Sequence, residues 1–257
     1  MKTLFIFIAL LFSSTAFGYQ HLAVGQGVSA PHQGLGTFFT NGFTNENSFA
    51  AAQLNKTRIT AGYAEGENDT SNIGAEFAYG NGNAGFQAGY LDRDCTNCED
   101  DFRANLAIQF AGIGFGVGFK EDLYSLSFLL NPDGQHRIGF VGESYQDADN
   151  SANEFFNVGV GYAFYSNNFV FSLDASKREY DTSLVNDDRV IVSPGLLVPF
   201  QSFSVSVTHD INVDLPENSD KKDETWFGIA LHPQNNFSVG VYSDFYGEWN
   251  ANVSLLF

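Results

Sequence analysis

The last ten residues of this 257-residue chain alternate between apolar and polar side chains. Every second residue counted back from the end is apolar, and the residues between are mostly Ser and Asn; the apolar ones are Phe257, Leu255, Val253, Ala251 and Trp249. Because successive side chains of a β-strand point to opposite faces, this period of two predicts a strand with one apolar face. About ten tilted residues also suffice to cross a bilayer. The stretch therefore predicts a membrane-spanning strand, with a buried edge strand of a soluble protein as the alternative.

The same period recurs from residue 56 onward, interrupted by clusters of turn-forming residues. It predicts fourteen strands, at about residues 56–65, 71–80, 84–92, 102–110, 113–120, 123–130, 136–146, 154–164, 168–179, 189–199, 202–213, 225–232, 236–244 and 248–257. In lipid only a closed barrel satisfies every backbone group of a sheet. We therefore expect an all-β fold, an antiparallel transmembrane β-barrel of fourteen strands, or of twelve if the short hairpins near residues 121 and 246 do not form.

The two ends of the chain indicate where such a barrel lies. A final strand that ends on an aromatic residue, here Phe257, resembles the assembly signal of bacterial outer-membrane β-barrels. The resemblance implies a location in the bacterial cell outer membrane, and the barrel-assembly machinery as a partner. Residues 1–18 predict a secretory signal peptide, with a positive charge at Lys2, an apolar core at 4–12 and small residues at 16 and 18. Beyond that segment no apolar run approaches the roughly 18 residues of a membrane helix, which excludes a helical inner-membrane protein.

The charge of the chain is strongly negative and unevenly placed. It holds 12 basic and 30 acidic residues, a net charge of −18, which argues against nucleic-acid binding because that requires a cationic surface. If the last strand ends in the periplasm, every long connection is an outer loop, and the short periplasmic turns hold only Asp133 among the acids. The outer acids keep the loops soluble, bind divalent cations that bridge them to lipopolysaccharide phosphates, or create a field that attracts cations.

Residues 19–55 lack the alternation and are rich in Gly and small residues. Because fourteen strands enclose more space than the eight whose side chains just fill an interior, we expect this segment to be a plug inside the barrel. A disordered periplasmic tail is the alternative. With Gly-Leu-Gly at 34–36, an Asn-rich stretch before the first strand, fourteen strands and Phe257, the chain resembles the FadL-like outer-membrane transporters. The nearest match to their Asn-Pro-Ala plug motif is Asn47 and Ala50, without the proline.

This resemblance implies passive transport of small hydrophobic molecules, which bind within the barrel and leave sideways into the membrane. A narrow cation-preferring diffusion channel, or a structural or adhesive surface barrel without transport, are the alternatives. Pro194 in the tenth strand cannot donate a ladder hydrogen bond and marks a bulge or a lateral gap. Six apolar residues fall on the inward face of the expected strands, where they line a hydrophobic route or pack against the plug: Leu91, Leu129, Val141, Val170, Ile191 and Leu197. The same face also holds a charged set that pairs across the lumen, holds the plug or sets selectivity: Arg58, Glu76, Arg103, Lys120, Arg137, Glu143, Asp174 and Arg178.

Other chemistry is weakly signalled. Cys95 and Cys98 lie in an expected outer loop, where an oxidising compartment favours a local disulfide. Two thiolates alone make a poor zinc site, since four ligands are usual. A barrel hydrolase needs a His beside a Ser nucleophile, and His209 has none on its own face of the strand. We therefore expect no enzymatic activity, no catalytic or metal site and no cofactor; the expected partners are outer-membrane lipids, lipopolysaccharide and a small hydrophobic ligand.

Overall fold

The computed structural model describes residues 57–65, 71–81, 83–94, 101–120, 123–130, 135–145, 154–166, 168–180, 189–214, 223–234, 237–244 and 249–257. The expected signal peptide, the expected plug segment with Asn47 and Ala50, and the Cys95 and Cys98 pair all lie outside these residues. Within the described ranges, no helix is long and apolar enough to cross a membrane.

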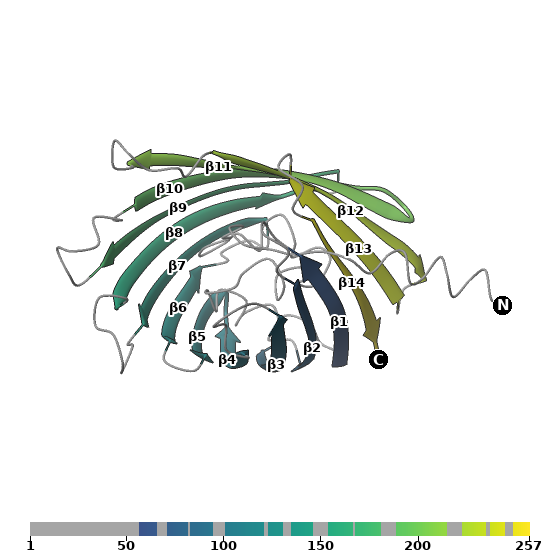
Figure 1. Cartoon of the computed structure of the whole chain (residues 1–257), viewed down its shortest axis with the longest axis horizontal. Helices are drawn as coiled ribbons and strands as arrows, with labels where there is room; N and C mark the ends of the chain where they lie inside the picture. The colour runs from purple at the N-terminus through teal and green to yellow at the C-terminus, as the bar shows by residue number, and fades with distance from the viewer. Residues whose placement is uncertain are drawn as a thin grey trace.

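Fourteen antiparallel strands form one closed barrel (Figure 1). They are β1 (Thr57–Glu65), β2 (Ser71–Gly80), β3 (Ala84–Asp94), β4 (Asp101–Phe110), β5 (Ile113–Lys120), β6 (Leu123–Leu130), β7 (His136–Tyr145), β8 (Phe155–Tyr165), β9 (Val170–Tyr180), β10 (Arg189–Pro199), β11 (Phe203–Asp214), β12 (Glu224–Gln234), β13 (Phe237–Asp244) and β14 (Trp249–Leu256). The predicted fold and strand count are confirmed. Twelve strands are excluded, because β5 pairs with β6 and β13 pairs with β14 across the two short hairpins in question.

The first and last strands close the sheet on itself. β1 and β14 pair over eight residues, from Arg58 opposite Leu256 to Glu65 opposite Trp249. The backbones of Thr57 and Phe257 extend this pairing by exchanging two hydrogen bonds, of 3.2 and 2.9 Å. Phe257 therefore belongs to the barrel wall, and neither edge of the sheet is left unpaired.

The connections alternate in length between the two ends of the barrel. At the end that holds Thr57 and Phe257 they span two to five residues, and at the other end they reach nine. Ala111 and Gly112 have positive φ angles of 50° and 80°, as a two-residue hairpin turn requires. The Asn81 side chain accepts hydrogen bonds from the backbone N–H groups of residues 83 and 84. Local turn chemistry therefore fixes the short connections, as the sequence pattern indicates.

Side chains alternate between the outside and the inside of the barrel wall. The outward positions carry exposed apolar side chains such as Ile73, Leu126 and Phe140. The inward positions are buried and hold many Ser, Thr, Asn, Gln and acidic side chains. In β8 this gives a nearly strict alternation of buried and exposed residues. The wall therefore presents an apolar surface outward and a mainly polar surface to its lumen.

The strand that contains Pro194, β10, has an irregular register, but the shift does not lie at Pro194. Pro194 lies within a continuous β10 and pairs with Leu173 of β9. Neither Pro194 nor Ser193 pairs with β11, as expected next to a residue without an N–H group, but the register on either side is unchanged. The register shift in this pair of strands lies between Val190 and Ile191, at the start of β10. Pro194 therefore interrupts the hydrogen-bond ladder without making a bulge.

Candidate functional site

A row of buried polar side chains crosses the inner wall from β1 to β8. Each position lies directly opposite the next one on the neighbouring strand. Only Ala78 on β2 and Gly118 on β5 interrupt the polar character. We call its polar members, each at most 4% exposed, the inner polar row: Arg58, Gln87, Asn105, Ser125, Glu143 and Asn157. The row exists because the period of two and the register between strands place one inward residue of each strand at the same level of the wall, and six of these eight residues are polar.

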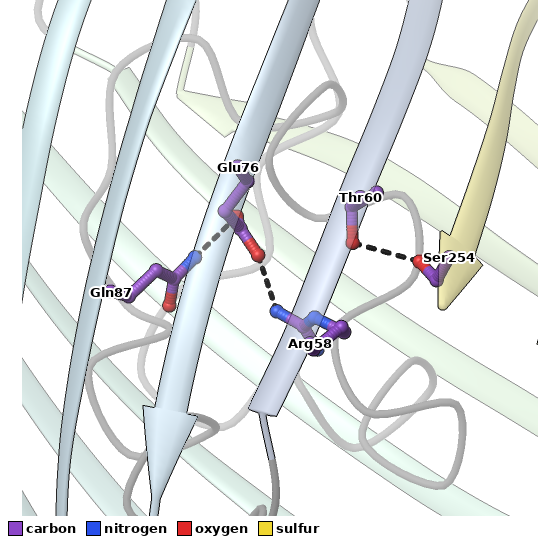
Figure 2. Close-up of polar contacts among 5 residues, drawn as sticks. All are labelled: Arg58, Thr60, Glu76, Gln87 and Ser254. Carbon is purple, nitrogen blue, oxygen red and sulfur yellow. Dashed lines mark hydrogen bonds and ion pairs between the residues drawn. The ribbon is translucent and has the colours of Figure 1, made fainter. Parts of the chain in front are cut away.

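The row begins at an ion pair between Arg58 and Glu76, an inward residue of β2. Arg58 Nη2 donates to Glu76 Oε1 at 2.5 Å, and Gln87 Nε2 on β3 donates to Glu76 Oε2 at 2.5 Å (Figure 2). Both oxygens of this carboxylate thus accept hydrogen bonds from the two adjacent strands. Since burying an isolated charge is costly, these contacts are what allow Arg58 and Glu76 to lie inside the wall.

A second contact joins the strands that close the barrel. Thr60 on β1 and Ser254 on β14 lie directly opposite each other, and their hydroxyl oxygens are 2.8 Å apart (Figure 2). Together with the Glu76 contacts, side-chain hydrogen bonds therefore link β14, β1, β2 and β3 on the inner face.

The far end of the row repeats the pairing of an amide with a carboxylate. Asn157 Nδ2 on β8 donates to Glu143 Oε2 on β7 at 2.9 Å. Between the two ends, Asn105 and Ser125 flank β5, where the buried residues 114, 116 and 118 are all Gly. Because glycine has no side chain, β5 contributes only backbone to the inner surface at these three positions.

Several buried atoms of this wall have no hydrogen-bond partner within the described residues. They include Arg58 Nε and Nη1, Gln87 Oε1, Asn105 Oδ1, Ser125 Oγ, Asn157 Oδ1 and both amide atoms of Asn252 on β14. A buried polar group without a partner costs about 1–3 kcal/mol. The inner polar row therefore presents both donors and acceptors to whatever occupies the lumen.

An apolar area lies on the inner wall between β4 and β10, nearer the end with short turns. Two groups of buried side chains form it, and Tyr165 packs against both. The Arg137 guanidinium lies 4.0 Å from the centre of the Tyr165 ring, and its Nη1 donates to the Tyr165 hydroxyl at 3.1 Å. We call this area the inner apolar patch: Ala107, Leu129, Val141, Ala163, Tyr165, Val170 and Leu197.

The structure places the lumen residues expected from the sequence as follows. Ile191 of the apolar set is buried in β10 outside the inner apolar patch. Four others of that set belong to the patch: Leu129, Val141, Val170 and Leu197. Of the charged set, Arg137 is partly buried and four others are almost fully buried: Arg58, Glu76, Glu143 and Asp174. The remaining four lie in strands, but their side chains fall outside the description: Leu91 in β3, Arg103 in β4, Lys120 in β5 and Arg178 in β9. The Arg58–Glu76 pair joins adjacent strands, whereas the sequence led us to expect pairing across the lumen.

The amides of the row and the aromatic centre of the patch were not predicted from the sequence. Gln87, Asn105 and Asn157 lie at inward positions of the two-residue period, and this position alone could have indicated them. Neutral amides were not included because only charged and apolar inward residues were selected. Tyr165 was assigned to a turn, whereas β8 extends to it and pairs it with Val170.

The described inner wall offers hydrogen bonds and apolar contacts to a solute. Within that part of the chain, no group of three or more His, Cys, Asp or Glu side chains could hold a metal ion. His209 Nδ1 lies 2.8 Å from Thr225 Oγ1 on β12. Thr208 and Asp210, its neighbours in β11, are buried on the inward face.

No protein-family model matches the chain, and no curated protein matches its sequence. Similar solved structures include a mutant of the Rhodopseudomonas blastica porin, 8% identical with a TM-score of 0.47, covering 79% of this chain and 99% of that one. They also include OccAB4 of Acinetobacter baumannii (13% identity, TM-score 0.43, 79% and 72% covered). A bacterial polysaccharide outer membrane secretin is similar at 10% identity and a TM-score of 0.46, with 79% and 98% covered. The barrel fold of this chain rests on its own strand pairing, and its function rests on its own wall.

Proposed function

We propose that this chain is a bacterial outer-membrane protein through which small hydrophobic molecules cross that membrane passively. Its strands are 8 to 12 residues long. At about 3.3 Å per residue and a tilt of about 40°, ten residues span about 25 Å, which is the height of the apolar band of such barrels. The exposed apolar side chains on the outside of the wall support a lipid environment, since leaving them in water costs about 25 cal/mol per Å².

The observation that carries the hydrophobic cargo is the inner apolar patch. The lumen of a membrane barrel is usually polar, yet Leu129, Val141, Val170 and Leu197 are buried on its inward face. An apolar molecule that leaves water for such a surface gains the free energy of burying its own apolar area. Arg137 lies beside Tyr165 of the patch, and the polar groups of these two side chains offer a contact to a molecule with one polar group.

Residues 19–55 are the plug in this proposal. The space inside fourteen strands and the resemblance to FadL-like transporters support this role. A plug prevents the barrel from being an open aqueous pore, so that a molecule which binds the wall passes while ions do not.

A narrow cation-preferring channel is the second candidate. The observation that favours it is the excess of acids on the described inner wall, where Glu76, Glu143, Asp174 and Asp210 are buried and Arg58 is the buried base. A lumen with a negative field raises the local concentration of cations.

Uptake into cells distinguishes the two candidates. We expect bacteria that carry the protein to take up a small uncharged hydrophobic fluorophore faster than bacteria without it. Leu197→Asn places a polar group in the inner apolar patch and should reduce the added uptake at least several-fold. Ser176→Ala, a buried inward change outside the patch, is the matched control and should leave uptake unchanged. Equal uptake with and without the protein, together with steady cation conductance, would replace the first candidate by the second.

A further inference from the structure

Asn252 on β14 indicates that the inner wall is covered by more than its own side chains. It is 0% exposed, and among the residues that the structure describes neither its amide nitrogen nor its amide oxygen has a hydrogen-bond partner. Its direct partners on the adjacent strands are Gly62 and Gly240, which have no side chains to cover it. Because eight strands already give an interior that side chains just fill, fourteen leave the middle of the lumen to other material. The burial of Asn252 between two glycines is what an occupant of the lumen explains.

The inner polar row specifies the chemistry of this occupant. Within the described part of the chain, Arg58 Nε and Nη1 have no hydrogen-bond partner, and Gln87, Asn105 and Asn157 each have a carbonyl oxygen without one. An occupant that satisfies them must itself carry both donors and acceptors. Since the charge of Arg58 is already balanced by Glu76, a neutral occupant suits this wall better than an ion.

Residues 19–55 have that composition. The chain contains 30 acidic and 12 basic residues, yet Glu46 is the sole Asp, Glu, Lys or Arg in this segment. Loss of charge from one segment of so acidic a chain is expected where the segment is buried. Its side-chain amides supply the donors and acceptors that the wall lacks: Gln20, Gln26, Gln33, Asn41, Asn45, Asn47, Gln53 and Asn55.

The position of the segment in the chain also fits. Only Lys56 separates it from the start of β1 at Thr57, and Arg58, the first member of the inner polar row, is the second residue of that strand. A chain that turns into the lumen at this point reaches Arg58, Gln87 and Asn252 within a few residues, since neighbouring strands are about 4.8 Å apart.

We propose that residues 19–55 are seated on the inner polar row and on Asn252, whose unpartnered atoms form the hydrogen bonds that fix the segment in the barrel. This inference rests on the plug of the proposed function and adds which wall holds it. The polar wall beside the closing strands, more than the inner apolar patch, then sets the position of the plug.

Accessibility of one residue in the segment tests the proposal. Ser48→Cys is introduced into a full-length mature chain in which Cys95 and Cys98 are changed to Ser, and the protein is folded into lipid vesicles. A water-soluble maleimide then measures how fast the thiol reacts. The row variant carries Gln87→Leu, Asn105→Leu and Asn252→Leu, and Asn212→Leu on β11 is the matched control. We expect slow labelling in the parent and the control, and labelling at least tenfold faster in the row variant.

The outcomes separate this inference from the plug itself. Fast labelling of the parent means that the segment is not inside the barrel, and both proposals then fail. Equally slow labelling of parent and row variant means that a plug is present but held elsewhere, which overturns only the seat proposed here. If the triple variant does not form a heat-resistant barrel, Asn252→Ala alone is measured in the same way, and the same two rates decide.

Discussion

At the scale of single residues, Arg58 and Glu76 are the most constrained part of the described wall. Each side chain is 1% exposed, and each depends on the other for neutralisation. A buried ion pair is seldom a large net source of stability, because the desolvation of both charges offsets their attraction. Its effect is seen when one partner is removed, since the other charge is then left buried without compensation.

We therefore expect strong coupling between substitutions at this pair. Glu76→Leu alone should destabilise the barrel by about 3–5 kcal/mol, because it leaves the Arg58 charge buried without a carboxylate. Arg58→Met combined with Glu76→Leu should cost much less than the sum of the two single changes. Urea unfolding of the parent, both single variants and the double variant in lipid vesicles measures this. Additive effects would mean that the two side chains do not depend on each other.

The same pair illustrates what sequence can predict about single residues. The parity of Arg58 and Glu76 was sufficient to place both on the inward face, because a period of two leaves only two choices. Parity does not give the partner, since that depends on the register between β1 and β2, which opposes Arg58 to Ala78 and sets Glu76 on the diagonal. The role of Gln87 follows from the same register and was missed for that reason.

At the scale of strands, β14 combines two functions in one stretch. It completes the sheet by pairing with β1 and β13, and it ends in Phe257, whose side chain is 70% exposed while its backbone is bonded to Thr57. The wall therefore uses the backbone of Phe257 and leaves its ring exposed, as a role of that ring as an assembly signal would require.

A substitution of Phe257 should separate assembly from stability. Phe257→Ser keeps both backbone hydrogen bonds and removes only the exposed ring. We expect the amount of folded barrel in cells to fall at least fivefold, whereas protein refolded from urea into vesicles should unfold at nearly the parent urea concentration. The change of gel mobility on heating reports the folded fraction in both cases. A normal amount of folded barrel in cells would argue against Phe257 as the assembly signal.

The presence of each strand could be predicted from the sequence for a physical reason, whereas the ends of the strands and their irregularities could not. A sheet with lipid on one side and a lumen on the other forces its side chains to alternate, so the sequence carries the pattern of all fourteen strands. Ends and irregularities depend on single hydrogen bonds that leave little trace in composition. β8 thus continues to Tyr165, and β10 shifts register between Val190 and Ile191 and not at Pro194.

At the scale of the whole molecule, the barrel is a closed wall with two kinds of inner surface. The inner polar row runs from β1 to β8, and the inner apolar patch lies between β4 and β10. In the proposed account the polar surface holds residues 19–55 and the apolar surface contacts the cargo. These two roles require that the lumen is blocked to ions when the chain is intact.

Single-channel conductance in a planar bilayer tests that claim most directly. The mature chain is compared with a chain that lacks residues 19–50 and keeps the residues that lead into β1. The account predicts no steady conductance from the intact chain and an open aqueous pore from the shortened one. Steady conductance from both would contradict it, because the lumen would then be open whether or not the segment is present.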